Sequence, residues 1–178
     1  VQRLNSEATR SRNLTEHLVS LRRDEDKQLL ASDEAVSHSL REYSQKDLKI
    51  IDKLLKNPYF ARFVVEEAVP SGFKKYEYKI GFYSNPDCSI IDWRRGPLAK
   101  LYYEYQEGEE YSELIQGRER NGTILVRNKV EIKNGQLKRL SCSLGTFISD
   151  NDEWKELKGG FLSRSAGGGK ELPSILAL

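Results

Sequence analysis

The last twenty residues contain the pattern most suggestive of chemistry, a lysine that directly follows three glycines. A phosphate-binding P-loop reads G-x-x-x-x-G-K-[S/T], because backbone amides cradle the phosphates and a hydroxyl group reaches magnesium. Around Gly169-Lys170, Arg164 stands in place of the first glycine, and Glu171 replaces the hydroxyl residue. A carboxylate there would repel phosphate, so the glycine-rich stretch is predicted to be a flexible, basic linker.

Histidine and cysteine do not indicate a reactive centre in this chain. His17 and His38 have no cysteine nearby at metal-ligand spacing, neither Cys88 nor Cys142 has a histidine close in sequence, and no G-x-S-x-G elbow occurs. We therefore assign no catalytic residue, no metal ligand and no cofactor to this chain. Without a secretory signal or a bilayer-spanning apolar run, reduced thiols and a cytoplasmic, non-membrane protein are expected.

Two groups of charged residues are candidates for recognition. The acidic run Asp24-Glu25-Asp26 is either a solvated face or turn, or the tip of an arm that approaches a metal or a basic groove. The cations Arg94, Arg95 and Lys100, beside tyrosines, could contact nucleic-acid phosphates while the rings stack on bases. More often such residues are strand positions whose polar side chains face outward and whose rings form the core, and a net charge of +2 does not by itself imply nucleic acid.

The elements that must position these residues fall into two classes. Residues 1–57 contain no glycine and carry single apolar stripes on charged helices, the pattern of a helical hairpin or coiled coil. Leu14, Leu18 and Leu21 form one such stripe. Within this region "RRDEDK", residues 22–27, is a hairpin turn or a solvated mid-helix face. Asn57-Pro58 is predicted to end the last helix.

From Tyr59 onward, short β-branched and aromatic runs alternate with turn signals. The strongest hairpin signals are Asn121-Gly122 and Asn134-Gly135, because Asn-Gly tolerates the positive φ angles of a type I′ turn. We expect an α+β fold in which residues 58–158 form a mainly antiparallel sheet or a partly open barrel. "DNDEWKEL", residues 150–157, is predicted to form a short helix, and residues 159–178 a linker.

One stretch, "SIIDWRRGPLAKLYYEY" at residues 89–105, is predicted to be a structural corner. A strand that ends in Asp92-Trp93-Arg94 would turn at Gly96-Pro97 into a second, aromatic strand, "LYYEY". Asp92 is then placed to pair with an arginine or to cap the turn.

Three ordered stretches resemble the N-terminal region of HelD-like proteins, relatives of UvrD/Rep-type superfamily 1 helicases. They are "NPYFARFVVEE", "YKIGFYS" and the corner above. The departures from the family pattern are Ala61, Phe82 and Arg95-Gly96. The positions that match are Tyr59, Phe60, Arg62, Ile80, Gly81, Asp92, Trp93, Arg94, Pro97, Ala99 and Tyr103.

The resemblance implies a parent protein that is an ATP-dependent, helicase-like hydrolase whose ATP- and Mg-binding residues lie downstream of Leu178. Residues 1–57 would be an arm that docks the motor onto bacterial RNA polymerase, residues 58–158 its mounting, and residues 159–178 a linker to the ATPase core. The corner would be a packing joint in which Arg94 binds a carboxylate. The alternative is an accessory domain that binds single-stranded or duplex DNA for a true helicase. The lack of methionine indicates either a piece of a longer protein or methionines missing from the recorded sequence, and the apolar end "SILAL" also leads us to expect a piece.

Overall fold

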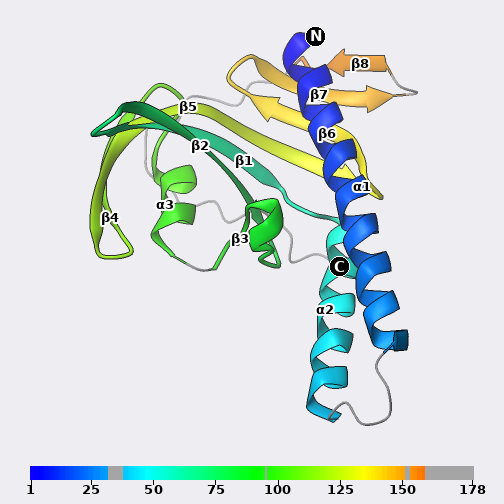
Figure 1. The fold of residues 1–178 in the computed structure, drawn as a ribbon. Helices are drawn as coiled ribbons and strands as arrows, with labels where there is room; N and C mark the ends of the chain where they lie inside the picture. The colour runs from blue at the N-terminus through cyan, green and yellow to red at the C-terminus, as the bar shows by residue number, and fades with distance from the viewer. Residues whose placement is uncertain (32–37, 95, 151–152, 159–178) are drawn as a thin grey trace.

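The computed structural model describes residues 1–31, 38–94, 96–150 and 153–158. Two long helices, α1 (Gln2–Ala31) and α2 (His38–Lys56), precede an eight-stranded sheet (Figure 1). A shorter helix, α3 (Pro97–Glu104), follows the third strand and precedes the fourth along the chain. A 3-10 turn, η1 (Pro86–Cys88), precedes strand β3. The strands are β1 (Ala61–Val69), β2 (Gly72–Gly81), β3 (Ile90–Asp92), β4 (Glu110–Ile115), β5 (Arg118–Lys133), β6 (Gln136–Cys142), β7 (Gly145–Asp150) and β8 (Glu153–Glu156).

The sheet is open and almost entirely antiparallel. Its strand order is β3-β2-β1-β5-β6-β7-β8, and β4 also pairs with β5. The short β3 runs parallel to β2, while every other pair of neighbouring strands is antiparallel. The α+β fold with a mainly antiparallel sheet is therefore confirmed, and the sheet does not close into a barrel.

The long strand β5 belongs to both halves of the sheet. Its pairing with β1 places Val64 opposite Val126 but Val65 opposite Ile124, so the register skips Leu125 and β5 contains a β-bulge. The bulge changes which residues face which side. Ile124 thus joins the core beneath α3, and Val130 joins the core beneath α1.

The two cores are built from opposite faces of β1. Phe63 and Val65 pack with α3 residues, whereas the side chain of Arg62, which directly precedes Phe63 in the sequence, points to α1. The α1-side core also takes in α2 and the 3-10 turn; its buried apolar members are Leu4, Leu14, Leu18, Leu54, Tyr59, Cys88, Ile90, Val130, Ile132, Leu137 and Leu140.

The helices α1 and α2 pack against each other, and their far halves extend beyond the sheet (Figure 1). The buried residues of α1 are confined to the stretch from Leu4 to Leu18. Further along, Arg22 Nε lies 2.6 Å from an oxygen of Asp52 and links the two helices. The run of residues 22–27 lies inside α1, so it is a mid-helix face rather than a turn.

One local prediction fails at the corner, because residues 101–104 of "LYYEY" belong to a helix and not to a strand. Pro97 is the first residue of α3, where its fixed φ angle favours a helix and its missing N–H is not needed. Ala99, Leu101 and Tyr102 are then buried against the sheet. Packing of this apolar face outweighs the strand preference of the tyrosines.

A second prediction fails at Asn121-Gly122, which lies within β5. The turn before β5 is formed instead by Gln116 and Gly117, which both have positive φ angles, of 52° and 75°. Gly122 is needed for close packing, since an added Cβ atom would lie 2.5 Å from the carbonyl oxygen of Glu66. Asn134-Gly135 does form the predicted turn, with φ angles of 50° and 77°.

The predicted helix over residues 150–157 is also wrong, because Glu153–Glu156 is strand β8. It pairs with β7, with Trp154 opposite Ser149. Trp154 packs against the α1-side core. A helix of eight residues is marginal alone, and pairing with an open sheet edge provides backbone hydrogen bonds that such a helix lacks.

Candidate functional site

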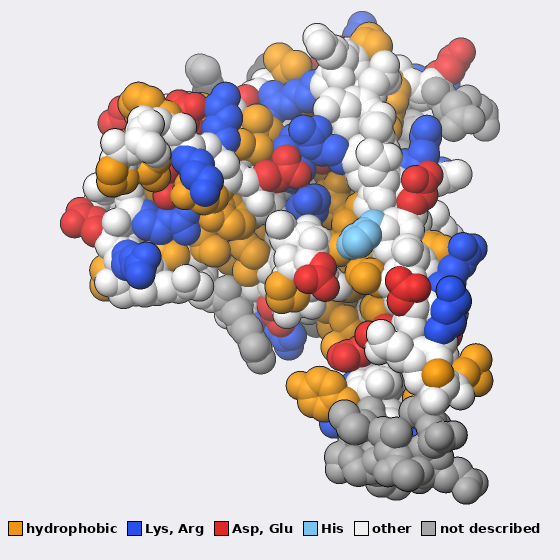
Figure 2. Space-filling model, viewed as in Figure 1, with side chains coloured by type: hydrophobic (Ala, Val, Ile, Leu, Met, Phe, Trp, Pro, Cys, Tyr) orange, Lys and Arg blue, Asp and Glu red, His pale blue; other side chains and the backbone are white. Residues whose placement is uncertain are grey.

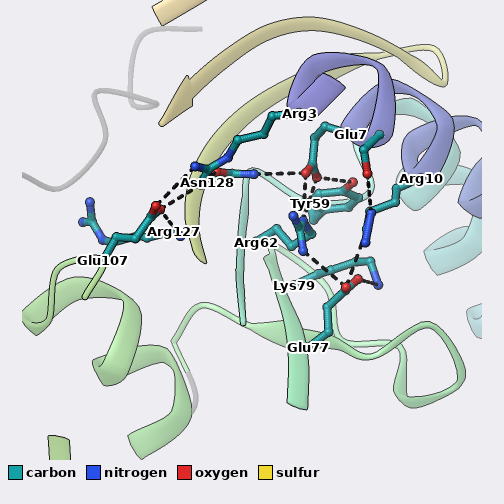
Figure 3. Close-up of polar contacts among 11 residues, drawn as sticks. Arg3, Glu7, Arg10, Tyr59, Arg62, Glu77, Lys79, Glu107, Arg127 and Asn128 are labelled. Atoms are coloured by element: carbon teal, nitrogen blue, oxygen red, sulfur yellow. Dashed lines mark hydrogen bonds and ion pairs between the residues drawn. The ribbon is translucent and has the colours of Figure 1, made fainter. Parts of the chain in front are cut away.

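Among the described residues, a cluster of polar side chains lies between α1 and the sheet (Figure 3). There, three polar side chains are almost completely buried: Glu7 is 1% exposed, Arg62 5% and Asn128 0%. They come from α1, β1 and β5, three elements that are far apart in the sequence. Buried charges are strongly unfavourable unless they are paired, so this cluster fixes how the helix sits on the sheet.

Glu7 is the centre of the cluster. Arg62 Nε donates to both oxygens of the Glu7 carboxylate at 2.9 Å, and the amide of Asn128 donates to one of them at 3.0 Å. The Tyr59 hydroxyl lies 3.5 Å from the other oxygen. Burial, together with the negative charge of Glu7, raises the pKa of Tyr59 well above its usual value.

Two further carboxylates extend this cluster on either side (Figure 3). On the β2 side, Glu77 lies 3.2 Å from Arg62, 3.6 Å from Arg10 and 3.3 Å from Lys79. A cation of α1 and a cation of β1 therefore share one carboxylate of β2. This arrangement ties the second turn of the helix to the two adjacent strands.

On the other side, Arg3 connects Asn128 to Glu107. One of its nitrogens donates to the Asn128 side-chain oxygen and to Glu107, both at 2.7 Å. Glu107 also accepts from the backbone N–H of Arg127 at 3.0 Å and from the Ser143 hydroxyl at 2.8 Å. Burial opposes ionisation of Glu107, but these hydrogen bonds prevail and lower its pKa below the ordinary value.

The cluster is saturated and therefore suited to positioning. Among the described residues, every buried side-chain nitrogen and oxygen has a hydrogen-bond partner. A carboxylate that already accepts hydrogen bonds from three side chains, as Glu7 does, is poorly suited to act as a base or a nucleophile. We define Arg3, Glu7, Arg10, Tyr59, Arg62, Glu77, Lys79, Glu107 and Asn128 as the anchoring network.

Residues of the first two resemblance motifs lie at this joint. Tyr59 and Arg62 belong to the anchoring network, whereas Phe60 faces the other core and contacts Phe82, with ring centroids 5.2 Å apart. A side chain at Gly81 would place its Cβ 2.6 Å from the carbonyl oxygen of Pro58. Glycine is thus required where the chain leaves α2 and crosses the end of β2.

The corner motif forms a separate joint at the edge of the sheet. The buried Asp92 accepts from the Arg94 backbone N–H at 2.9 Å and from its guanidinium at 2.8 and 3.0 Å, as predicted. These bonds raise the pKa of Arg94.

The other corner residues pack at the α3 side of the sheet. Trp93 is half-buried against the α3-side core, and Tyr103 lies in α3, edge-on to Tyr102. Pro97 begins α3, as described above.

The residues proposed to contact nucleic acid are partly engaged elsewhere. Arg94 pairs with Asp92, while Lys100 donates to both oxygens of Glu113 at 2.8 and 2.9 Å and lies 3.5 Å from Glu104. The hydrogen bond to Glu113 raises the pKa of Lys100. Arg95 lies outside the described residues. The two described cations therefore face carboxylates.

The acidic run lies in the last turns of α1. Asp26 pairs with Arg22, one helical turn earlier, at 2.9 Å, whereas Asp24 is exposed. Within the described residues, no group of three His, Cys, Asp or Glu side chains could hold a metal ion. These acidic residues are thus a solvated helix face in the described structure.

Sequence reasoning missed the α1 half of the anchoring network. The apolar stripe at Leu14 and Leu18 continues backwards at spacings of three and four through Ser11, Glu7 and Leu4, all of which are buried. A charged residue inside such a stripe is the signal that could have revealed Glu7. Asn128 gives no comparable signal, because its burial depends on the bulge in β5.

A second buried ion pair was also missed. On the α3 side of the sheet, the carboxylate of Glu67 pairs with Arg120 at 2.7 Å and accepts a hydrogen bond from Tyr111. Arg120 in turn donates to the Tyr78 hydroxyl at 3.0 Å. This pair joins β1 to β4 and β5, so each core contains one buried, fully paired carboxylate.

Comparisons with known proteins identify no relative. No model of a known protein family matches the chain, and no curated protein matches it. Among the helices of the described residues, none is long and apolar enough to span a membrane. The HelD-like resemblance therefore rests on its own motif residues.

Proposed function

We propose that this chain is the non-catalytic docking module of a HelD-like, helicase-related ATPase, and that it contacts bacterial RNA polymerase through its two long helices. In this proposal α1 and α2 form a helical hairpin that serves as an arm, and the sheet is its mounting. ATP and Mg would bind to the parent protein downstream of Leu178.

The observation that carries the proposal is the asymmetry of α1. Its first half holds all of its described buried residues and its contacts with the anchoring network, whereas its second half extends past the sheet beside α2 (Figure 1). A helix that only stabilised the sheet would gain nothing from this extension. A helix that must reach a partner needs both an anchored end and a projecting end.

The surface of the projecting part is consistent with contacts to a protein. On the side shown in Figure 2, cations and carboxylates alternate along the helices. Exposed apolar residues also occur there, with Leu30 87% and Tyr43 70% exposed. Aromatic and apolar residues within a polar surface are common anchors of protein interfaces.

A shortened arm tests this proposal. Residues 25–44 are replaced by a short glycine-rich turn, which keeps Leu4 to Leu18 and the Arg22–Asp52 pair. We expect binding to purified core RNA polymerase to weaken at least about tenfold, a loss typical of removing an interface anchor, while the circular dichroism of the sheet stays unchanged. The double variant Arg94→Gln, Lys100→Gln is the control and should bind as wild type does. Equal binding by the shortened variant would refute the arm.

The alternative, a DNA-binding accessory domain that uses Arg94, Arg95 and Lys100, is less well supported. Arg94 and Lys100 each face a carboxylate, as described above. Loss of single-stranded DNA binding in the same Arg94→Gln, Lys100→Gln variant would favour this alternative. ATP hydrolysis by the isolated chain would contradict a non-catalytic module of either kind.

A further inference from the structure

A hollow of about 490 Å³ lies beside the anchored half of α1 and is not part of the anchoring network. One wall is formed by α1, with Asn5, Ala8 and Arg12, and the floor by β6 and the turn before it. Trp154 of β8 and Ser149 of β7, which are directly opposite each other in the sheet, complete the lining. The volume falls within the range of about 300–1,000 Å³ that is usual for ligand sites.

The charged side chains among the described residues that line this hollow are all positive. Arg12 and Lys138 line it from two different elements. Neither is in an ion pair with a described carboxylate, and Lys138 donates to the side-chain oxygen of Gln136 at 2.8 Å. No acidic residue is among the described residues that line it. In β7 and β8, the carboxylates of Asp150 and Glu153 alternate with Ser149 and Trp154, so they point to the opposite face of the sheet. A hollow with two unneutralised cations attracts an anion.

The ring of Trp154 adds a second requirement for the ligand. It is half-buried, packing on the α1-side core while also lining the hollow. An indole face beside two cations suits a planar ring attached to a phosphate, since base stacking and phosphate pairing are the two components of single-strand recognition. The side-chain NH2 groups of Asn5 and Gln136 lie in the same lining and can donate to a base edge, while the Gln136 oxygen accepts from Lys138.

From this geometry we infer that the hollow binds single-stranded nucleic acid, with one base stacked on Trp154 and the adjacent phosphates on Arg12 and Lys138. The site lies away from the corner at Arg94 and Lys100, and it is independent of the docking proposed above. The two cations flank the hollow from different elements, which suits a strand that continues past it.

Binding of a short, labelled oligothymidine to the full chain, followed by fluorescence anisotropy, tests this inference. The variant Arg12→Gln, Lys138→Gln is expected to bind at least about tenfold more weakly, as for loss of two phosphate contacts. The slope of log K against log salt should become shallower by about 1.4, since each phosphate contact on a single strand contributes about 0.7. Arg94→Gln, Lys100→Gln is the matched control and should keep the wild-type affinity and slope.

Tryptophan fluorescence tests the stacking directly. The chain has two tryptophans, so Trp93→Phe leaves Trp154 as the sole reporter. Its emission should be quenched as the oligothymidine is added, and Trp154→Leu, checked for folding by urea unfolding, should lose about tenfold or more in affinity. Unchanged binding by Arg12→Gln, Lys138→Gln, or a control variant that weakens binding equally, would overturn the site. So would equal binding of a polyglutamate peptide, because it carries charge without bases.

Discussion

At the scale of single residues, Glu7 is the side chain on which the anchoring network depends most. It neutralises Arg62 at a position where both are almost fully buried and shielded from solvent screening. A buried ion pair adds little compared with an apolar pair of the same shape. Removing one partner is different, because it leaves an uncompensated charge in the interior.

Glu7→Gln is therefore expected to lower the free energy of unfolding by about 3–5 kcal/mol. Urea unfolding followed by circular dichroism measures this change. Asp52→Asn is the matched control, because it removes one partner of the Arg22–Asp52 pair, whose side chains are 42% and 48% exposed. That variant should lose about 1 kcal/mol or less. Similar losses in both variants would show that burial of Glu7 is not what matters.

The lowered pKa of Glu107 predicts how the stability of the protein changes with pH. Its pKa is lower in the folded protein than the ordinary value of 4.5. Its stabilising effect is thus fully present above about pH 4.5 and is lost as the pH falls through the lower, folded-state pKa. The difference in unfolding free energy between wild type and Glu107→Gln should shrink as the pH is lowered from 5 to 3.

The control for this pH dependence is Glu110→Gln, which removes an exposed carboxylate of β4. It should keep the wild-type change of stability with pH. A constant difference between wild type and Glu107→Gln across the whole acid range would contradict the lowered pKa of Glu107.

At the scale of elements, α1 is one helix with two unlike halves. Residues 2–18 contribute to the α1-side core and the anchoring network, and residues 20–31 contain no buried side chain. Backbone amides open more readily where few apolar contacts hold the helix in place. The same element should therefore differ in local stability along its length.

Hydrogen exchange followed by mass spectrometry can detect this difference. Peptides from residues 2–18 should exchange slowly, at rates near those of β1 and β5, and peptides from residues 20–31 should exchange much faster. Glu7→Gln should speed exchange in the first half alone. Uniform protection along α1 would contradict the division of the helix.

Sequence reasoning located most elements but not their partners. The long α-helical region, strands β1, β2, β3, β5 and β6 and the Asn134-Gly135 turn follow from local patterns that operate over a few residues, whereas β4 and β7 were not predicted. The helix α3, the passage of β5 through Asn121-Gly122 and strand β8 do not, because each depends on packing against distant parts of the chain. Glu7 and Asn128 meet across 121 positions of sequence, and no local pattern encodes that contact.

At the scale of the whole molecule, removing the projecting parts of α1 and α2 should leave the sheet intact. The variant that lacks residues 25–44 retains both cores and all of the anchoring network. Its urea midpoint should therefore remain close to that of wild type. Removing residues 1–18 should instead abolish the sheet's cooperative unfolding.

Together, these two deletions test whether the projecting residues are dispensable for folding of the sheet and whether residues 1–18 are required for it. If the shortened variant lost its sheet, the projecting residues would be structural and the extension would need another explanation. If the variant without residues 1–18 stayed folded, the anchoring network would be dispensable to the sheet.

The bulge at Leu125 has a mechanical consequence. Because β5 supplies residues to the packing beneath both α1 and α3, a pull on the projecting helices is transmitted through Glu7 and Asn128 into the strand common to both cores. A force applied to the described projecting residues of α1 and α2 would therefore act on both halves of the sheet together.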